Sequence, residues 1–259
     1  MAPSRHDPGL TGRLGLRLLS IASIFLVWWI GSVLLGERLC PGPVTVLAFA
    51  GREIASGELP YQLTITLARV AAAFTLAMAI GTALGLAMGR NAVANDLAEP
   101  WVILLLNAPA LIVIVLAYIW IGLTEAAAIL AVALNKIPNV TVTIREGSRA
   151  LDAGLIEMAK VYRFGRGRML RHVILPQLHP YIAAAGRSGL ALIWKIVLVV
   201  ELLGRSNGIG FKIHLYFQVF DVRAILAYTI VFVGIMLAIE FIVVQPIEKR
   251  AYRWRPRPA

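Results

Sequence analysis

The sequence predicts an all-α membrane protein with six transmembrane helices and with its N- and C-termini in the cytoplasm. Of the 259 residues, 59% are hydrophobic and only 15% are charged, a balance that soluble domains of this size do not show. A membrane-spanning helix needs roughly 20 mostly apolar residues, and six segments reach that length. They cover residues 16–35, 62–88, 98–120, 125–144, 180–203 and 224–245.

The basic residues indicate how these helices are oriented. The chain carries a formal net charge of +11, and membrane proteins collect Lys and Arg in their cytoplasmic loops. With the N-terminus inside, 16 Lys and Arg fall in the inner segments and 5 in the outer loops. The charge therefore follows the membrane topology, and no nucleic-acid partner is expected.

This topology divides the chain into a cytoplasmic N-terminal tail, residues 1–15, a transmembrane domain, residues 16–245, and a basic cytoplasmic tail, residues 246–259. The first apolar segment follows two arginines, as a signal peptide would. It is long and lacks a small-residue cleavage site, so we expect it to remain as a helix. Between Pro43 and Pro60, the spacing of apolar residues predicts an amphipathic helix on the outer surface; these are Val44, Leu47, Ala48 and Ile54. Packing of the same residues against the protein explains their spacing equally well.

The largest inner loop, residues 145–179, contains the basic stretch EMAKVYRFGRGRMLRHVILP, from Glu157 to Pro176. Asp152 is a typical helix N-cap, and we expect Pro176 to end a second short helix after the glycines that follow Phe164. An apolar face is predicted at helical spacing, made of Leu155, Met158, Ala159 and Tyr162. Judged on its own, this loop is equally typical of an amphipathic hairpin resting on anionic lipid headgroups.

The triplet Glu157-Met158-Ala159, followed in the same loop by Leu175-Pro176, resembles the cytoplasmic EAA signature of binding-protein-dependent ABC importer permeases. Further stretches resemble the same family along most of the chain: CPGPVTVL, LTITLARVAAAF, GRSGLALIWKIVLVVELLGRSNGIGF and IEKRAYRWR. The resemblance implies a type I ABC importer permease fold in the bacterial cytoplasmic (inner) membrane. The six-helix pattern is similar to the nitrate, sulfonate and taurine permeases of this family.

The resemblance also implies partners for the chain. These are a cytoplasmic ABC ATPase dimer, an extracytoplasmic solute-binding protein, a second permease copy, usually identical, and membrane lipid. No Gly-x-x-x-x-Gly-Lys-Ser/Thr motif is present, so we expect no cofactor on this chain and ATP and magnesium on the partner ATPase. The residues expected to couple the two proteins are Glu157, Met158, Ala159, Lys160, Tyr162, Arg163 and Phe164.

The sequence departs from the family pattern where the family has a glycine after the triplet. Arg163 stands at that position, and a non-glycine residue disfavours the left-handed backbone that glycine adopts at little cost. We therefore expect the chain to follow another path there.

Four cations lie at membrane depth, where each needs a partner, a cavity or a ligand. Counting about 1.5 Å per helical residue places Arg187 level with Glu240, which predicts a structural ion pair. Arg69 lies in the predicted outer third of its helix with Glu201 and Glu125 farther out. We therefore predict that Arg69 makes a long or water-bridged structural pair with these carboxylates.

Lys136 and Lys195 both fall near the predicted midplane, and no carboxylate is level with them. Asn107 lies near the same depth. Because transporters bind their substrates at midplane helix interfaces, we expect these three residues to line the path of an anionic solute. The alternative is that the lysines snorkel or pack between helices in the deprotonated state.

Three other functions remain open at the sequence level. A membrane enzyme would need a nucleophile, an acid–base pair or a metal cluster at one depth, but the four histidines show no ligand spacing and Cys40 is the single cysteine. No metal site is therefore expected. A non-ABC carrier or assembly scaffold would show no nucleotide dependence, and an exporter is disfavoured by the absence of a fused ATPase domain.

Overall fold

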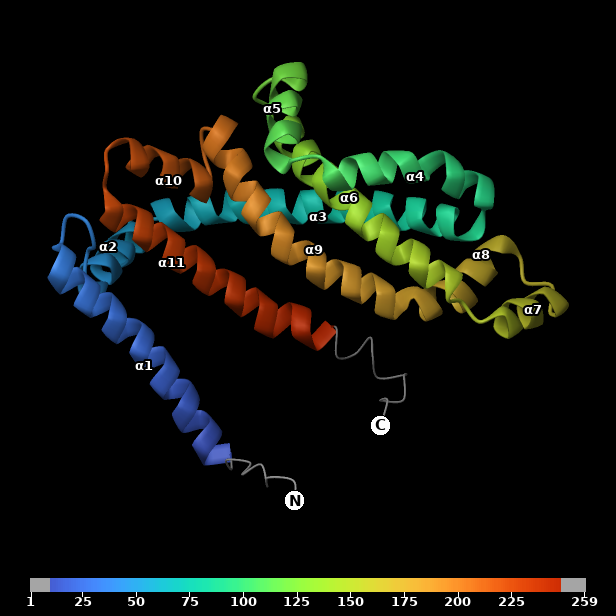
Figure 1. Cartoon of the computed structure of the whole chain (residues 1–259), viewed down its shortest axis with the longest axis horizontal. Helices are drawn as coiled ribbons and strands as arrows, with labels where there is room; N and C mark the ends of the chain where they lie inside the picture. Colours follow the sequence, from blue (N-terminus) through green and yellow to red (C-terminus); the bar gives the residue numbers. More distant parts are fainter. Residues whose placement is uncertain (1–9, 248–259) are drawn as a thin grey trace.

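The computed structural model describes residues 10–247, and in that range the chain is helical without any strand (Figure 1). The predicted basic tail after residue 247 and the first nine residues lie outside the described residues. Eleven α-helices and two π-helical turns, η1 and η2, follow one another in the described part. Their bounds are α1 Leu10–Leu35, α2 Pro43–Ala55, α3 Glu58–Arg90, α4 Ala92–Asn107, α5 Ala110–Ile121, α6 Glu125–Arg149, α7 Ala153–Val161, α8 Arg166–Met169, η1 Leu170–Ile174, α9 Leu175–Gly204, α10 Ile209–Gln218, α11 Val222–Ile239 and η2 Glu240–Val244.

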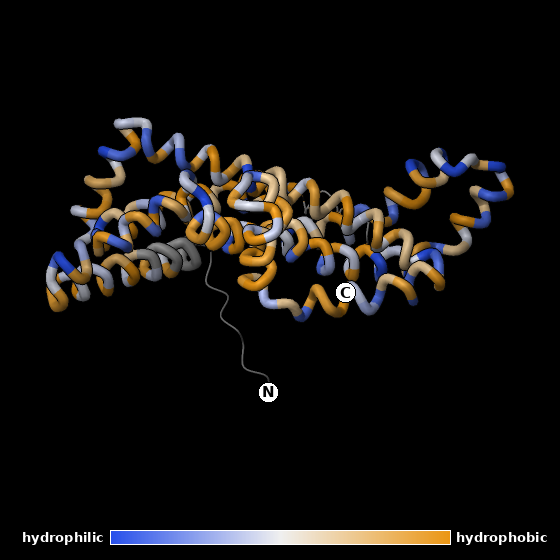
Figure 2. The backbone as a smooth tube through the Cα atoms, turned by 90° about the horizontal axis from the view of Figure 1, so that it is seen from above, coloured by the Kyte–Doolittle hydropathy of each residue, from blue (hydrophilic) through white to orange (hydrophobic). Residues whose placement is uncertain are grey.

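Four helical segments of the described residues are long and apolar enough to cross a membrane. They are Glu58–Arg90, Glu125–Arg149, Arg166–Gly204 and Val222–Ile247, and the bent pair α4–α5 makes a fifth if it is one span. The described apolar part of α1, Ala22–Leu35, is shorter than this test requires. Hydrophobic residues run along the bundle while hydrophilic ones concentrate toward its two ends (Figure 2), as expected for a membrane protein.

Helices α3, α6 and α9 form the packed centre, and Figure 1 shows α6 and α9 crossing α3. The close approach of α3 to α6 depends on a glycine stripe. A Cβ added at Gly81 would lie 2.6 Å from the Val140 side chain, and one at Gly85 would lie 2.5 Å from the Thr141 carbonyl. Backbones can come this close only where the side chain is absent.

The predicted single helix 98–120 is wrong, because the structure breaks it. Helix α4 ends at Asn107, α5 begins at Ala110, and the two axes differ by 102°. Pro109 lacks an N–H and its ring clashes with the preceding turn, and Ala108 adopts the extended backbone that precedes a proline. In Figure 1, α5 stands away from the layer formed by α3, α4 and α6.

The predicted amphipathic helix between the prolines is confirmed as α2. It buries Val46 and Ala50 against α11, while Val44 and Leu47 of the predicted apolar stripe are exposed. The apolar stripe thus faces away from the protein, as it does in a helix that lies on a membrane surface. Helix α1 diverges from the body in Figure 1 and is held at its end, where Trp28 Nε1 donates to the Pro41 carbonyl at 3.0 Å.

Candidate functional site

The stretch that carries the EAA-like triplet forms a hairpin of α7, a turn and α8, here called the α7–α8 hairpin. The predicted cap is confirmed, because the Asp152 side chain accepts hydrogen bonds from the Gly154 and Leu155 amides at 2.7 and 3.3 Å. Gln177 Oε1 accepts from the Asp152 amide at 2.8 Å. This bond ties the start of the hairpin to the first turn of α9.

The predicted apolar face of α7 is largely exposed in the single chain. Ala159 is fully buried, but Leu155 and Met158 are 42% and 44% exposed and Tyr162 is 70% exposed. The nine-residue helix projects beyond the bundle, so the rest of the described chain covers these side chains only in part. Val161, which the periodicity did not single out, is 79% exposed beside them.

Arg163 adopts the left-handed backbone, with φ of +50°, which corrects the expectation that an arginine would take another path there. Its amide donates to the Lys160 carbonyl, and the Phe164 amide donates to the Ala159 carbonyl, both at 2.9 Å. These two bonds satisfy carbonyls at the end of α7 and hold the turn. The backbone therefore follows the path expected of the family's glycine, even though a larger residue occupies the position.

Pro176 does not end the second short helix, contrary to prediction. Helices α8 and α9 join through the π-helical turn η1 in one unbroken helical run, Arg166–Gly204. A proline clashes with the carbonyl four residues earlier and lacks its own donor. The π turn directly before it disrupts the regular ladder, so the proline is accommodated at the start of α9.

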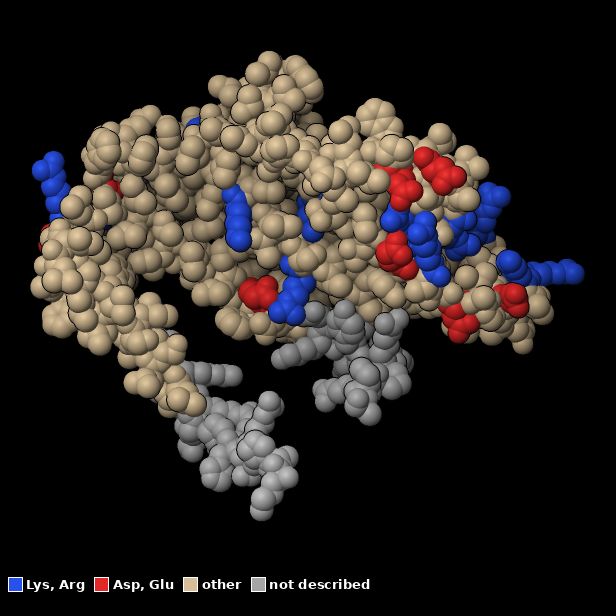
Figure 3. Space-filling model, in the orientation of Figure 1, with Lys and Arg blue, Asp and Glu red and all other residues tan. Residues whose placement is uncertain are grey.

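The charged residues of the hairpin are exposed, including Glu157, Lys160 and Arg163. The Arg168 guanidinium lies 5.6 Å from the centre of the half-buried Phe164 ring. In Figure 3, basic and acidic side chains gather at the end of the molecule that holds α7 and α8. The α7–α8 hairpin thus presents both apolar and charged side chains away from the bundle.

Arg69 lies in a buried polar network at the other end of the bundle. Its guanidinium contacts Glu201 Oε1 and Glu125 Oε1, each at 2.7 Å, and it also donates to Asn207. Arg69 is 4% exposed and Glu201 is fully buried. The contacts are direct, which corrects the predicted long or water-bridged geometry.

Sequence reasoning missed the part that α10 plays in this network. The amides of Gly208, Ile209 and Gly210 donate to Gln62, Thr66 and Glu201, at 2.6, 2.9 and 2.8 Å. Three orphan donors of a helix N-terminus are thereby satisfied by side chains of α3 and α9. The closely spaced glycines in SNGIG were the available signal, because a Cβ at Gly210 would collide with the Leu198 carbonyl.

The structure also brings Arg187 and Glu240 together, with Nε and Oε1 3.4 Å apart. The arginine lies on α9 and the glutamate opens η2. Their side chains are 46% and 30% exposed, so the pair is much less buried than Arg69 and Glu201.

The three residues expected to line a path lie in three different surroundings. Lys136 on α6 is 2% exposed and packs against Gly189 of α9, where an added Cβ would lie 2.6 Å from the lysine Cε. Lys195 is exposed and lines a crevice between α9 and α11. Asn107 is exposed at the α4–α5 break and donates to the Ile103 carbonyl at 2.8 Å.

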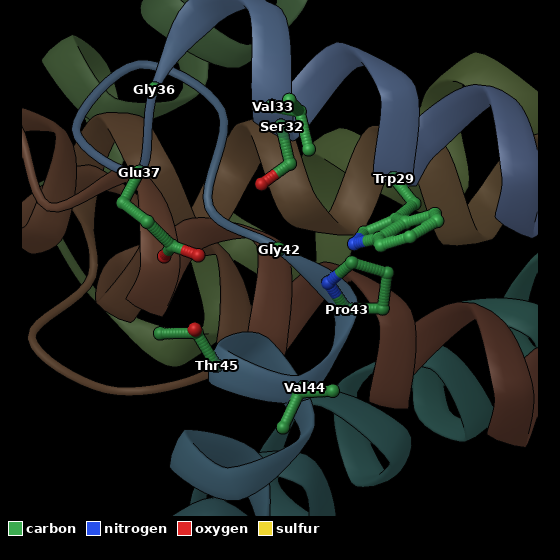
Figure 4. A pocket seen from close by; sticks show the side chains of 9 residues that line it. All are labelled: Trp29, Ser32, Val33, Gly36, Glu37, Gly42, Pro43, Val44 and Thr45. Atoms are coloured by element: carbon green, nitrogen blue, oxygen red, sulfur yellow. The ribbon is translucent and has the colours of Figure 1, made fainter.

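A second cavity of about 370 Å³ lies where α1 turns into α2. Figure 4 shows the Trp29 ring on one side and the polar Glu37 and Thr45 side chains on the other. None of the predicted site residues lines it. In the described residues, no group of three or more His, Cys, Asp or Glu could hold a metal ion.

Comparison with known proteins defines the class to which this helical architecture belongs. The family model described as "Binding-protein-dependent transport system inner membrane component" matches residues 77–245. A probable ABC transporter permease protein of Brucella abortus (strain 2308) is 31% identical over 248 residues, covering 96% of this chain and 98% of the relative. A Bacillus subtilis (strain 168) relative named as the aliphatic sulfonates transport permease protein SsuC is 31% identical, covering 92% and 87%.

The fold is also found among solved structures. An inward-facing structure of the MetNI methionine ABC transporter aligns with a TM-score of 0.62 at 19% identity, covering 73% of this chain and 93% of that one. The architecture is that of a type I ABC importer permease. The chain belongs to the family of inner-membrane permease components of binding-protein-dependent ABC transporters, and it is a multi-pass protein of the bacterial inner membrane.

Proposed function

We propose that this chain imports a small anionic solute, such as an alkyl sulfonate, taurine or nitrate, and couples that import to a separate ATPase through the α7–α8 hairpin. The observation that carries the coupling is the exposure of Met158, Val161 and Tyr162 beside Glu157 and Lys160 on a projecting helix. Exposed apolar and aromatic side chains grouped in this way are typical of protein interfaces.

The permease assembly includes two copies of this chain, a solute-binding protein outside and an ATPase dimer inside. Nucleotide and magnesium are bound by the ATPase, and this chain holds no cofactor. The hairpin moves with the ATPase, and the Asp152–Gln177 hydrogen bond passes that movement to α9. Glu157, Lys160, Arg163 and Phe164 flank the apolar contact.

The anionic class of solute rests on membrane-depth cations and on a relative. The Bacillus subtilis relative is named for aliphatic sulfonates, and Lys195 has no acidic partner within 4.0 Å among the described residues. An unpaired cation at this depth is best explained by a ligand or a cavity. Lys136, which packs against Gly189 of α9, contributes a second positive charge. The Asn107 side-chain amide at the α4–α5 break is available to hydrogen-bond the solute.

Co-purification with the ATPase tests the coupling proposal. Tyr162→Asp places a charge in the apolar contact, and we expect the ATPase to dissociate and ATP-driven uptake to be lost. The matched control is Tyr61→Asp, an exposed tyrosine at the far end of α3, which should retain the complex. A stable complex with full uptake in Tyr162→Asp contradicts the proposal. A chain that never binds an ATPase supports the alternative of a non-ABC carrier or scaffold.

A further inference from the structure

The crevice between α9 and α11 has a volume of about 420 Å³, which is within the range of small-molecule sites. Its walls are mainly apolar. The apolar side chains that line it include Leu190, Trp194, Phe232, Met236 and Leu237. The Trp194 and Phe232 rings meet edge to face, with centroids 6.1 Å apart, and both side chains are buried. The crevice is therefore lined in part by a packed aromatic pair.

Lys195 is the one polar group of this crevice that is left to bind a ligand. The Thr229 hydroxyl donates to the Ile225 carbonyl at 2.8 Å, and Glu240 pairs with Arg187. The Lys195 ammonium has neither an ion pair nor a hydrogen bond within the described chain. A cation at membrane depth beside an apolar hollow suits a ligand that carries one anionic group and a hydrocarbon tail.

We propose that this crevice binds an alkyl-chain monoanion, with the anionic group on Lys195 and the chain along Trp194, Phe232 and Met236. This inference deepens the proposed function and rests on it only for the identity of the solute. The ligand chemistry can be supplied by an alkyl sulfonate or by an anionic phospholipid.

The lining of the crevice supplies a reason for selecting a single negative charge. Glu240 lies on the crevice wall one helical turn beyond Met236 and is paired with Arg187, so no cation other than Lys195 is left to receive an anion. A second anionic group on the tail would have to enter the apolar part of the crevice without a partner, and an unpaired buried charge is costly. A hydrocarbon tail meets no such penalty.

Binding to the purified chain in phosphatidylcholine nanodiscs tests the proposal without requiring an ATPase. Calorimetric titration would compare methanesulfonate, butanesulfonate and octanesulfonate. Each methylene buried in an apolar site strengthens binding by roughly fourfold, so we expect the affinity to rise steeply with chain length. Butane-1,4-disulfonate should bind much more weakly than butanesulfonate.

Substitutions at two positions separate binding of the ligand's anionic group from binding of its hydrocarbon tail. Lys195→Met should abolish sulfonate binding, whereas Lys195→Arg should retain it. Ala191→Phe fills the crevice, because Ala191 lines it and is exposed, and should weaken octanesulfonate while leaving methanesulfonate unchanged. The control is Arg52→Met, an exposed cation on α2, which should bind all three ligands like the parent chain.

Native mass spectrometry with added phosphatidylglycerol distinguishes the two sources of ligand. Retention of this lipid that depends on Lys195 and resists octanesulfonate identifies a lipid site, and displacement by octanesulfonate identifies a solute site. Either result supports an alkyl-anion site. Equal affinity for all chain lengths, or unchanged binding in Lys195→Met, overturns the proposal. Neither outcome alters the ATPase co-purification that tests the coupling function.

Discussion

Arg69 and Glu201 form a fully buried ion pair, with Nη1 and Oε1 2.7 Å apart. The carboxylate also accepts from Thr66 and from the Gly210 amide, at 3.0 and 2.8 Å. Buried charges are stable only when they are paired and their remaining hydrogen-bonding capacity is satisfied, and here both conditions hold. The pair joins α3 to α9 and positions the start of α10.

Replacing Glu201 by Gln should destabilise the protein strongly. Arg69 keeps its contact with Glu125 at 2.7 Å, but the substitution removes the charged acceptor of the Arg69, Thr66 and Gly210 hydrogen bonds. A lost hydrogen bond to a charged group costs about 1.5–3 kcal/mol. Glu99→Gln is the matched control, because Glu99 pairs with Arg145 at 3.0 Å but is 42% exposed, and exposed pairs contribute at most about 1 kcal/mol. Thermal unfolding in detergent should show a large decrease in Tm for the first variant and a small one for the second. Equal decreases would contradict this account.

Much of the fold could be predicted because hydrophobic length depends on local sequence. The spans that became α3, α6 and α11 are continuous apolar segments, and their length alone defines them. The break at Pro109 was not predicted, because apolar residues continue on both sides of it. Hydropathy reports whether a residue prefers lipid, but it does not report the direction of the helix axis.

Counting residues along the helices predicted which charged residues lie at the same depth, but it did not predict the direction in which each side chain points. Arg187 and Glu240 are level and do approach each other. Lys136 and Lys195 are also at similar depth, yet one is 2% exposed behind Gly189 and the other is exposed in a crevice. The number of residues along a helix determines the depth of a side chain directly. The direction in which the side chain points depends on how the helices pack, which a single sequence does not reveal.

The glycine stripe of α3 makes the α3–α6 contact sensitive to single methyl groups. Gly85→Ala would put a Cβ 2.5 Å from the Thr141 carbonyl and 2.8 Å from the Ile144 Cβ. The backbone cannot move aside as a flexible side chain can, so we expect the substitution to lower the free energy of unfolding by about 1–3 kcal/mol. Thermal unfolding of the purified chain measures this loss of stability.

Gly51→Ala is the control for this substitution. It lies on α2 with no atom within 4 Å of an added Cβ, so alanine should be neutral or stabilise the helix by up to about 1 kcal/mol. A decrease in Tm of the same size for both variants would contradict the assignment of the loss to the close α3–α6 contact.

Gly189 and Lys136 should show coupled stability effects. An added methyl at Gly189 lies 2.6 Å from the lysine Cε, so Gly189→Ala must displace that side chain and should cost about 1–2 kcal/mol. In a Lys136→Ala background the lysine side chain is absent, so Gly189→Ala should lower the stability of the protein much less. A double-mutant cycle on Tm measures the interaction, and strict additivity would contradict the packing seen here.

Arg163→Gly should stabilise the turn of the α7–α8 hairpin. Arg163 has a φ of +50°, and a left-handed backbone costs a non-glycine residue about 1–2 kcal/mol. Glycine removes that strain but loses more backbone entropy on folding, so we expect a net gain near 0.5–1 kcal/mol. Lys160→Gly, one turn earlier in regular α-helix, should instead lose about 0.5–1 kcal/mol. Amide hydrogen exchange across 153–164 should slow in the first variant and accelerate in the second. Faster exchange in both would mean that the Arg163 side chain holds the turn through contacts that outweigh its strained backbone.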